Sequence, residues 1–281
     1  DMAEPLENEI YEEMVPLLRR IDDQQVLLKK QNKELAEAES MRRDFSSNVS
    51  HEMKTPLQVI SGYAELMKND MVLPGDRQKF AGLIYDEAQA MRGLINDVLT
   101  LSKLDESAFT REELPIDAKA VAERMAGRLT SFAADQGVSI QVTGDEALIR
   151  GSETLAEEML YNLIENGVRY NHEGGSVTVS VSQDSASQQD IATLREAGAE
   201  GDINSVVTVR VADTGPGIPV EAREKVFQRF FRLDKSRSKE TGGTGLGLAI
   251  VKHAVQYHRG VISVEGAPGE GTTFVLKFPG A

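Results

Sequence analysis

Apolar positions near the start of the chain recur with the seven-residue spacing of a coiled coil. The seam positions are Leu17, Ile21, Gln24, Leu28, Gln31, Leu35 and Ala38. They predict one long helix over about residues 7–67, interrupted in regularity at Pro16 and Pro56. So thin a stripe needs a partner helix. The seam glutamines weaken pairing relative to leucine, which favours a signal-carrying coil over the alternative, an ordinary spacer.

A second helix with a wider apolar face is predicted over about residues 76–104. That face comprises Phe80, Leu83, Ile84, Ala88, Met91, Leu94, Ile95, Val98 and Leu101. The preceding turn carries Pro74 and Gly75, so the two helices should form an antiparallel hairpin. Because apolar faces of this width cover each other poorly in one hairpin, we expect a homodimer closing into a four-helix bundle.

One amphipathic stretch within the first helix carries reactive side chains. Its apolar stripe, at steps of four, is Phe45, Val49 and Met53. His51 lies off this stripe and should face outward. Pro56 has no N–H for the carbonyl of Glu52, so the helix is expected to bend just after the histidine. Thr55 follows His51 by four residues and therefore shares its face.

Beyond a polar hinge at residues 104–116 the pattern becomes a mixture of strands and helices. Strands are predicted at 138–142, 148–150, 177–181, 206–211, 261–265 and 272–278, and helices at 117–136, 153–170, from Pro219 to about 232, and at 248–257. Residues 183–204, rich in Ser, Gln, Ala and Gly, are predicted to be a surface insertion in a hairpin, with a short helix at 190–197. The expected fold class is α+β.

Composition narrows the functional classes. The chain has 281 residues, enough for two domains, and a formal net charge of -14 at pH 7. This acidic balance argues against nucleic acid as a partner. The absence of cysteine excludes disulfides and thiolate zinc sites. No run approaches eighteen apolar residues, so we expect no membrane contact by this stretch. A start at Asp1 rather than methionine suggests a fragment of a longer protein.

Four motifs resemble the boxes of one family. Asn162-Leu-Ile-Glu-Asn166, Asp213-Thr-Gly-Pro-Gly217 and Gly243-Thr-Gly-Leu-Gly247 resemble the nucleotide-binding boxes of the sensor histidine kinases of two-component systems. Phe45–Leu57 resembles the phosphoacceptor box of that family. The order and spacing also match, and the resemblance covers nearly everything after Arg42. The chain is similar to the phosphate-sensor and cell-wall-sensor kinds.

The resemblance implies three parts and their ligands. They are a signalling coiled-coil helix (1–41), a dimerisation and histidine-phosphotransfer domain (42–110) and an α/β-sandwich ATP-binding domain of the gyrase and histidine-kinase type (111–281). ATP and Mg²⁺ are the implied cofactors. A response regulator receiver domain is the implied partner besides a second copy, and the implied location is the cytoplasmic portion of a bacterial membrane sensor.

Two asparagines on one helix suggest the first part of a nucleotide site. Asn162 and Asn166 are four apart and share a face, and an amide buried unpaired costs on the order of 1–3 kcal/mol. The resemblance implies that Asn166 is the Mg²⁺ ligand. Asn162, Arg169 and Tyr170 match phosphate- and adenine-facing positions, with arginine where lysine is common. Glu165 is predicted to point to another side of the helix and is not assigned as a base.

The segment after the strand at 206–211 suggests the adenine end of the site. A glycine-rich turn alone would explain its shape. The resemblance assigns Asp213 to the exocyclic amine of adenine, which selects ATP over GTP. It places Gly215, Gly217 and Ile218 beside the ligand, where glycine lets the backbone approach closely.

A basic residue and a glycine cluster complete the implied site. Arg232 matches an arginine that reaches the γ-phosphate. Residues 233–241 have no apolar anchor and are predicted to be a mobile lid. Backbone N–H groups at the following helix start can bind phosphates. The implied nucleotide contacts there are Gly243, Thr244, Gly245, Leu246, Gly247 and Leu248. The three phenylalanines just before Arg232 are expected to serve packing, and the other histidines, His172, His253 and His258, are treated as ordinary.

The resemblance implies a protein-histidine kinase. His51 would attack the γ-phosphorus while Glu52 accepts or orients the other ring proton, and the phosphoryl group would pass to an aspartate of a response regulator. Thr55 would position water for dephosphorylation of that regulator. Two alternatives stay open. One is a hydrolysing ATPase of the gyrase class, disfavoured because Asn162 cannot act as a base, and the other is a dimeric nucleotide-binding scaffold without kinase activity.

Overall fold

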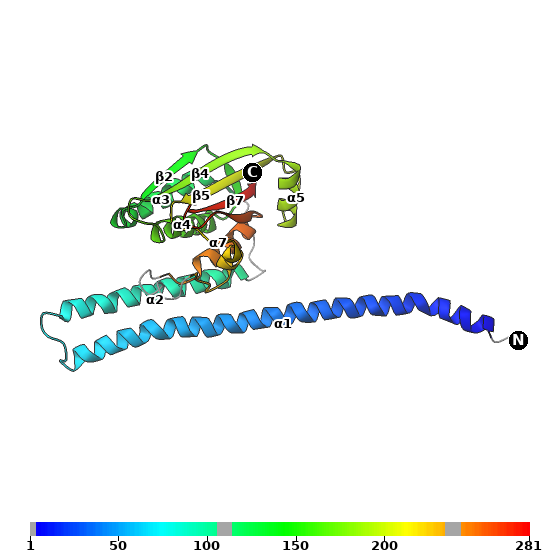
Figure 1. Ribbon diagram of the computed structural model, residues 1–281, viewed down its shortest axis with the longest axis horizontal. Helices are drawn as coiled ribbons and strands as arrows, with labels where there is room; N and C mark the ends of the chain where they lie inside the picture. The colour runs from blue at the N-terminus through cyan, green and yellow to red at the C-terminus, as the bar shows by residue number, and fades with distance from the viewer. Residues whose placement is uncertain (1–3, 106–113, 234–242) are drawn as a thin grey trace. The chain divides into compact units, whose positions relative to one another are not determined.

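The computed structural model describes residues 4–105, 114–233 and 243–281 (Figure 1). The chain divides into two compact units, residues 1–54 and 55–281. None of the helices within the described stretches combines the length and apolarity that a bilayer span requires. Most of the predicted lid, from residue 234 to 241, lies outside the described residues.

Helix α1 runs unbroken from Glu4 to Lys68. The single long helix is as predicted, and Pro16 and Pro56 do not end it, because both positions are helical. A proline removes one N–H donor, but the hydrogen bonds of the neighbouring turns remain and hold the helix together. Two seam leucines, Leu28 and Leu35, are exposed in the single chain.

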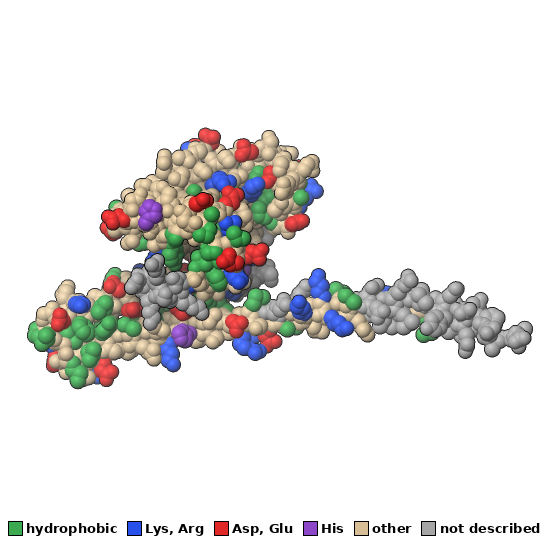
Figure 2. Space-filling model, viewed as in Figure 1, with side chains coloured by type: hydrophobic (Ala, Val, Ile, Leu, Met, Phe, Trp, Pro, Cys, Tyr) green, Lys and Arg blue, Asp and Glu red, His purple; other side chains and the backbone are tan. Residues whose placement is uncertain are grey.

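Helix α2 (Arg77–Asp105) follows α1 after a short turn, as predicted. The rings of Tyr63 and Phe80 meet edge to face, with their centroids 5.1 Å apart, and join residues 55–68 to α2. Around this hairpin several large apolar side chains are exposed: Leu57, Leu66, Met71, Leu73, Tyr85, Ile95 and Leu99. Figure 2 shows hydrophobic side chains gathered at the turn of the hairpin. The hairpin therefore leaves much of its apolar surface uncovered.

A five-stranded mixed sheet forms the centre of the remaining chain. Its strands in spatial order are β2 (Ser139–Gly144), β4 (Ser176–Ser185), β5 (Ser205–Asp213), β7 (Thr272–Pro279) and β6 (Val261–Gly266). β2 and β4 are parallel and the other pairs are antiparallel. A separate antiparallel pair joins β1 (Leu114–Asp117) to β3 (Leu148–Gly151). The predicted strands are confirmed, and β1 was not predicted.

Three helices cover one face of the sheet (Figure 1): α3 (Ala118–Asp135), α4 (Glu153–Arg169) and α7 (Gly247–Tyr257). On β4 the alternate residues Val177, Val179 and Val181 are buried in the core, whereas the serine and threonine residues between them are only partly buried. This alternation makes one face of the strand apolar. The result is a two-layer α/β sandwich, the predicted class for this part.

The predicted helix from Pro219 to residue 232 is wrong. The segment holds two short 3-10 turns, η1 (Val220–Ala222) and η2 (Lys225–Phe227). Phe230 has a φ of 61°, which a right-handed helix cannot include. Phe227 packs edge to face on Phe274 at 6.3 Å, so its packing role is confirmed.

The insertion at 183–204 is a small packed unit between antiparallel β4 and β5. Its helix α5 (Gln188–Glu196) begins with a capping box formed by Ser187 and Asp190. Lys277 on β7 donates to Asp190 at 2.7 Å and ties the insertion to the sheet. Its buried side chains Leu194, Ala199 and Ile203 form a cluster with Val206 of β5. The predicted surface insertion with a short helix is confirmed.

Candidate functional site

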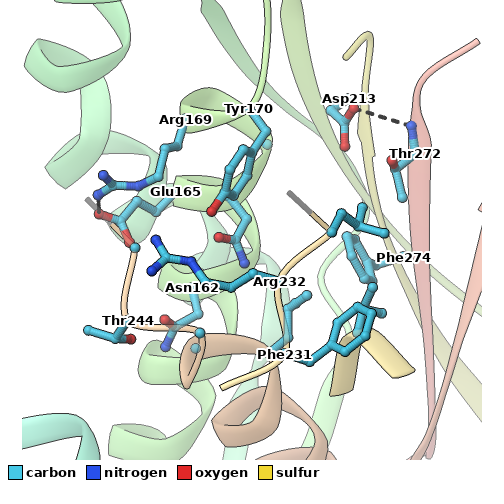
Figure 3. A pocket seen from close by; sticks show the side chains of 18 of the residues that line it. Asn162, Glu165, Arg169, Tyr170, Asp213, Phe231, Arg232, Thr244, Thr272 and Phe274 are labelled. Carbon is cyan, nitrogen blue, oxygen red and sulfur yellow. Dashed lines mark hydrogen bonds and ion pairs between the residues drawn. The ribbon is translucent and has the colours of Figure 1, made fainter. Parts of the chain in front are cut away.

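A cavity of about 840 Å³ lies among α4, the ends of β5 and β7, and the start of α7 (Figure 3). The predicted site residues that line it are Asn162, Asn166, Arg169, Tyr170, Asp213, Gly217, Ile218, Arg232, Gly243, Thr244, Gly245, Gly247 and Leu248. The asparagine motif and the two glycine motifs, which span more than 80 residues of the sequence, therefore meet at one cavity. Gly215 and Leu246 do not line the cavity.

Asp213 stands at the end of β5 with its carboxylate fixed by the backbone. Its Oδ1 accepts hydrogen bonds from the N–H of Gly215 at 2.9 Å and of Thr272 at 3.2 Å. Burial raises the pKa of this carboxyl, and the two N–H donors oppose that shift. Within the described part of the chain, Oδ2 accepts no hydrogen bond. The carboxylate can therefore receive a donor from a ligand.

Gly215 and Leu246 support the cavity from behind. Gly215 is buried, and a Cβ there would meet Asp213 Oδ1 at 2.9 Å and the Tyr170 carbonyl oxygen at 3.0 Å. Leu246 is fully buried in the core at the start of α7. Both residues were predicted as nucleotide contacts; in this structure Gly215 aligns Asp213, and Leu246 anchors the start of α7.

Asn162 packs against the start of α7. Its Nδ2 donates to the carbonyl oxygen of Glu158 at 2.8 Å, one turn earlier on α4. Its Oδ1 lies where a Cβ on Gly247 would approach to 2.6 Å. The glycine therefore lets α7 begin directly against the amide, and Asn162 sets the distance between α4 and α7.

The glycine segment presents backbone to the cavity. Gly245 has a φ of 72°, and a Cβ there would crowd the backbone of Phe230 at 3.0 Å. The α7 N-terminus has no side-chain cap. Uncapped N–H groups at a helix start attract anions. A Cβ on Gly243 would lie 3.0 Å from Tyr170 Oη, so glycine at this position leaves room for the tyrosine side chain.

Thr244 joins the glycine segment to α2. Its Oγ1 donates to Asp97 Oδ2 at 2.7 Å and accepts from the N–H of Leu246 at 3.2 Å. The pKa of Asp97 is raised to about 6, first by burial and then by the charges of Glu158 and Glu165, while the Thr244 hydroxyl opposes this shift. Asp97 also lines the cavity, which places an acid beside the glycine segment.

Two guanidinium groups lie away from Asp213. Figure 3 shows Asp213 at one side of the cavity and the head groups of Arg169 and Arg232 toward the other. Arg169 Nη2 pairs with Glu165 Oε1 at 2.6 Å. Glu165 lines the cavity, so the prediction that it points to another side of the helix is wrong. The two guanidinium groups thus stand apart from Asp213, in a part of the lining that also holds the carboxylates of Asp97, Glu158 and Glu165.

His51 and Glu52 lie on the unit formed by residues 1–54. The side chain of His51 is 80% exposed, and its Nδ1 lies 3.9 Å from Glu52 Oε1. The adjacency of His51 and Glu52 in the sequence does not predict this short distance, because neighbouring side chains on a helix point in different directions. Thr55, the next predicted residue, is exposed on α1. The imidazole is therefore open to a reactant and has a carboxylate beside one nitrogen.

Several residues around the cavity were not predicted: Gln89, Asp97, Glu158, Phe231, Thr272 and Phe274. They come from α2, α4, β7 and the segment after η2, and they carry no local motif. Among the described residues, no group of three or more His, Cys, Asp or Glu side chains is placed to hold a metal ion.

Comparisons with known proteins match both halves of the chain. The model of the histidine kinase-, DNA gyrase B- and HSP90-like ATPases matches residues 151–281. The model of the His Kinase A (phospho-acceptor) domain matches residues 41–107. A solved structure, full-length ShkA in complex with AMPPNP, matches 84% of this chain and 45% of its own, with a TM-score of 0.57 and 27% identity.

Curated relatives extend the match across most of the chain. The sensor-like histidine kinase SenX3 of Mycolicibacterium smegmatis is 34% identical over 88% of this chain and 59% of its own length. The phosphate regulon sensor protein PhoR of Pseudomonas aeruginosa is 33% identical over 85% of this chain and 50% of its own length. The chain thus spans roughly half the length of these relatives. With a phospho-acceptor domain followed by the ATPase domain, the chain belongs to the sensor histidine kinase family.

Proposed function

We propose that the chain transfers the γ-phosphoryl group of ATP to His51. The observation that carries this proposal is the cavity that has the Asp213 carboxylate on one side and two guanidinium groups toward the other. The uncapped N-terminus of α7 also borders the cavity through Gly247 and Leu248. A ligand with an amine-bearing base and a chain of phosphates is complementary to this distribution of charge.

Adenine fits the Asp213 end. An acceptor fixed by two backbone N–H groups at Oδ1 can take the exocyclic amine of adenine at Oδ2. Guanine presents an oxygen at that position and would face the carboxylate with a second acceptor. Gly217 and Ile218 line the adjoining wall, where glycine permits close contact. ATP is therefore the proposed nucleotide.

The phosphates would extend toward Arg232, Arg169 and the glycine segment. Asn166, half-buried on α4, supplies the amide oxygen for Mg²⁺. Such a site fits this ion, since Mg²⁺ keeps several waters and takes few protein oxygens beside the phosphates. When bound, Mg²⁺ neutralises charge on the phosphates. The guanidinium of Arg232 stabilises the charge that develops on the γ-phosphoryl group during transfer.

The geometry around His51 supports different roles for its two nitrogens. Nδ1 faces Glu52 at 3.9 Å, so Glu52 accepts or orients the proton on that nitrogen. Nε2 is then the nucleophile. It forms the new N–P bond, the bond from the γ-phosphorus to the bridging oxygen breaks, and ADP leaves with the electron pair. A neutral imidazole with high exposure suits this reaction.

The proposal includes a homodimer. Exposed seam leucines on α1 and exposed apolar side chains around the hairpin turn support it, because a second copy would cover them. The proposed parts are the coil at 1–41, the phosphotransfer domain at 42–110 and the ATP-binding domain at 111–281. Pairing of β1 with β3 supports the last of these boundaries.

The downstream partner is a response regulator receiver domain, to whose aspartate the phosphoryl group passes. Thr55 would position water for the reverse task, hydrolysis of the regulator's aspartyl phosphate. We place the chain in the cytoplasmic portion of a membrane sensor. Substitution of Thr55 by alanine tests the phosphatase part, since it should slow regulator dephosphorylation and leave labelling of His51 intact.

Incorporation of label and release of phosphate from γ-labelled ATP distinguish the proposal from the hydrolase and the inactive scaffold. A kinase incorporates label into the chain and releases little free phosphate. Sustained phosphate release without labelling would favour the hydrolase, and nucleotide binding without either would favour the scaffold. Asn162 supports the kinase because an amide cannot activate water as a base.

A further inference from the structure

We infer that Glu165 is a positioning residue that holds Arg169 in the orientation that binds phosphate. The inference rests on the proposed nucleotide site and adds a residue to which the family motifs assign no role. It concerns two side chains of α4 that stand one turn apart and both line the cavity.

The guanidinium of Arg169 is held from two directions. Its Nη2 lies 2.6 Å from Glu165 Oε1, and its Cζ lies 5.4 Å from the centroid of the Phe132 ring on α3. A ring contact and an ion pair together restrain the plane of the group. A planar head that is oriented before binding loses less entropy when it meets a phosphate.

This pair differs from ordinary surface pairs. The side chains of Arg169 and Glu165 are 23% and 24% exposed. On the same helix, Glu157 pairs with Arg124 at 3.1 Å outside the cavity, with side chains 33% and 44% exposed. Exposed pairs contribute little because water screens them. The shielded position of the Glu165 pair favours a geometric task at the cavity wall.

The direction in which Glu165→Gln changes nucleotide affinity distinguishes a positioning role from a purely electrostatic one. Glu165 puts a negative charge beside the place proposed for phosphates. If it acted only through its charge, Glu165→Gln would tighten nucleotide binding, because repulsion would disappear. If it positions Arg169, the same substitution weakens binding, because the guanidinium loses the restraint that the ion pair supplies.

The test measures the affinity of the full 281-residue chain for Mg-ATP and Mg-ADP by titration calorimetry. We expect Glu165→Gln to weaken both by about fivefold, a typical coupling between contacting residues. Glu165→Asp should recover part of the loss. In an Arg169→Gln background, Glu165→Gln should cause no further loss. Glu157→Gln, the matched control, should leave affinity unchanged, and thermal unfolding should show that each variant is folded.

These measurements distinguish failure of the proposed nucleotide site from failure of the proposed role of Glu165. Absence of nucleotide binding in the unmodified chain would overturn the proposed function. Normal binding in the unmodified chain, with equal or tighter binding in folded Glu165→Gln, would overturn the inference alone. A loss of the same size with and without Arg169 would also overturn it, because Glu165 would then act through another group.

Discussion

The hydroxyl of Thr244 donates a hydrogen bond of 2.7 Å to the carboxylate of Asp97, across 147 positions of the sequence. Thr244 belongs to the glycine segment that lines the cavity, and Asp97 lies on α2. A phosphate near Thr244 would compete with this carboxylate for the hydroxyl and would be repelled by its charge. The contact therefore opposes nucleotide binding when Asp97 is ionised.

Replacement of Asp97 by asparagine should tighten Mg-ATP binding. The amide keeps an acceptor for Thr244 and removes the charge beside the cavity. We expect affinity to rise about threefold to tenfold, the effect of one nearby charge in a partly screened site. Calorimetry measures it, with Asp86→Asn as the control because Asp86 is exposed on α2 outside the cavity. Unchanged or weaker binding in the Asp97 variant would refute this competition.

The same carboxylate should make stability depend on pH. Its pKa is raised from 3.8 to about 6, so between these values the folded chain binds a proton that the unfolded chain has lost. Stability should therefore fall as pH rises from about 4 to about 6 and change little above that range. A pKa shift of this size corresponds to a change of at most about 3 kcal/mol in the free energy of unfolding.

The difference in unfolding free energy between the unmodified chain and Asp97→Asn isolates this contribution. Other acids titrate in both proteins and cancel in the difference. Denaturant unfolding at several pH values should show the variant gaining relative stability as pH rises from 4 to 6. A difference that stays constant over this range would mean that Asp97 is not desolvated as described.

Asp213→Asn should abolish most nucleotide binding. The substitution conserves shape, and its side-chain oxygen can still accept from Gly215 and Thr272, so the fold should persist. The amide nitrogen would then face the adenine amine, donor against donor. We expect affinity to fall by about 10- to 150-fold, the value of a hydrogen bond to a charged group. Retained affinity in a folded variant would place the adenine elsewhere.

Gly247→Ala should disturb the junction of α4 and α7. The new Cβ would approach Asn162 Oδ1 to 2.6 Å, and the cost of such overpacking is about 1–3 kcal/mol. Asn162→Ala in the same chain removes the clashing atom and should restore part of the lost stability. Thermal unfolding of the single and double variants measures both effects. Purely additive losses would show that the two residues do not meet.

Long periodic elements and the motif residues were predictable from the sequence. Helices α1, α2, α3, α4 and α7 follow apolar periodicity, and the strands of the main sheet follow alternation. The asparagine and glycine motifs converge on one cavity as expected. These features have local signals, either a period or a dense cluster of unusual residues.

The features that were missed depend on contacts distant in sequence or on local geometry that has no period. β1 spans four residues, includes Pro115, and exists through its pairing with β3. Asp97 enters the site through Thr244, which no spacing on α2 predicts. After Pro219 the residues have helical propensity, but the backbone at Phe230 takes a positive φ and carries Arg232 into the cavity. Tertiary packing overrides propensity in such places.

The central claim is that nucleotide held beside Asp213 gives its γ-phosphoryl group to His51. Incubation of the purified chain with γ-labelled Mg-ATP tests it most directly, with His51→Gln and Asp213→Asn in parallel. We predict label on the unmodified chain that is stable in alkali and labile in acid, no label above background on His51→Gln, and strongly reduced label on Asp213→Asn. Equal labelling of His51→Gln would contradict the claim.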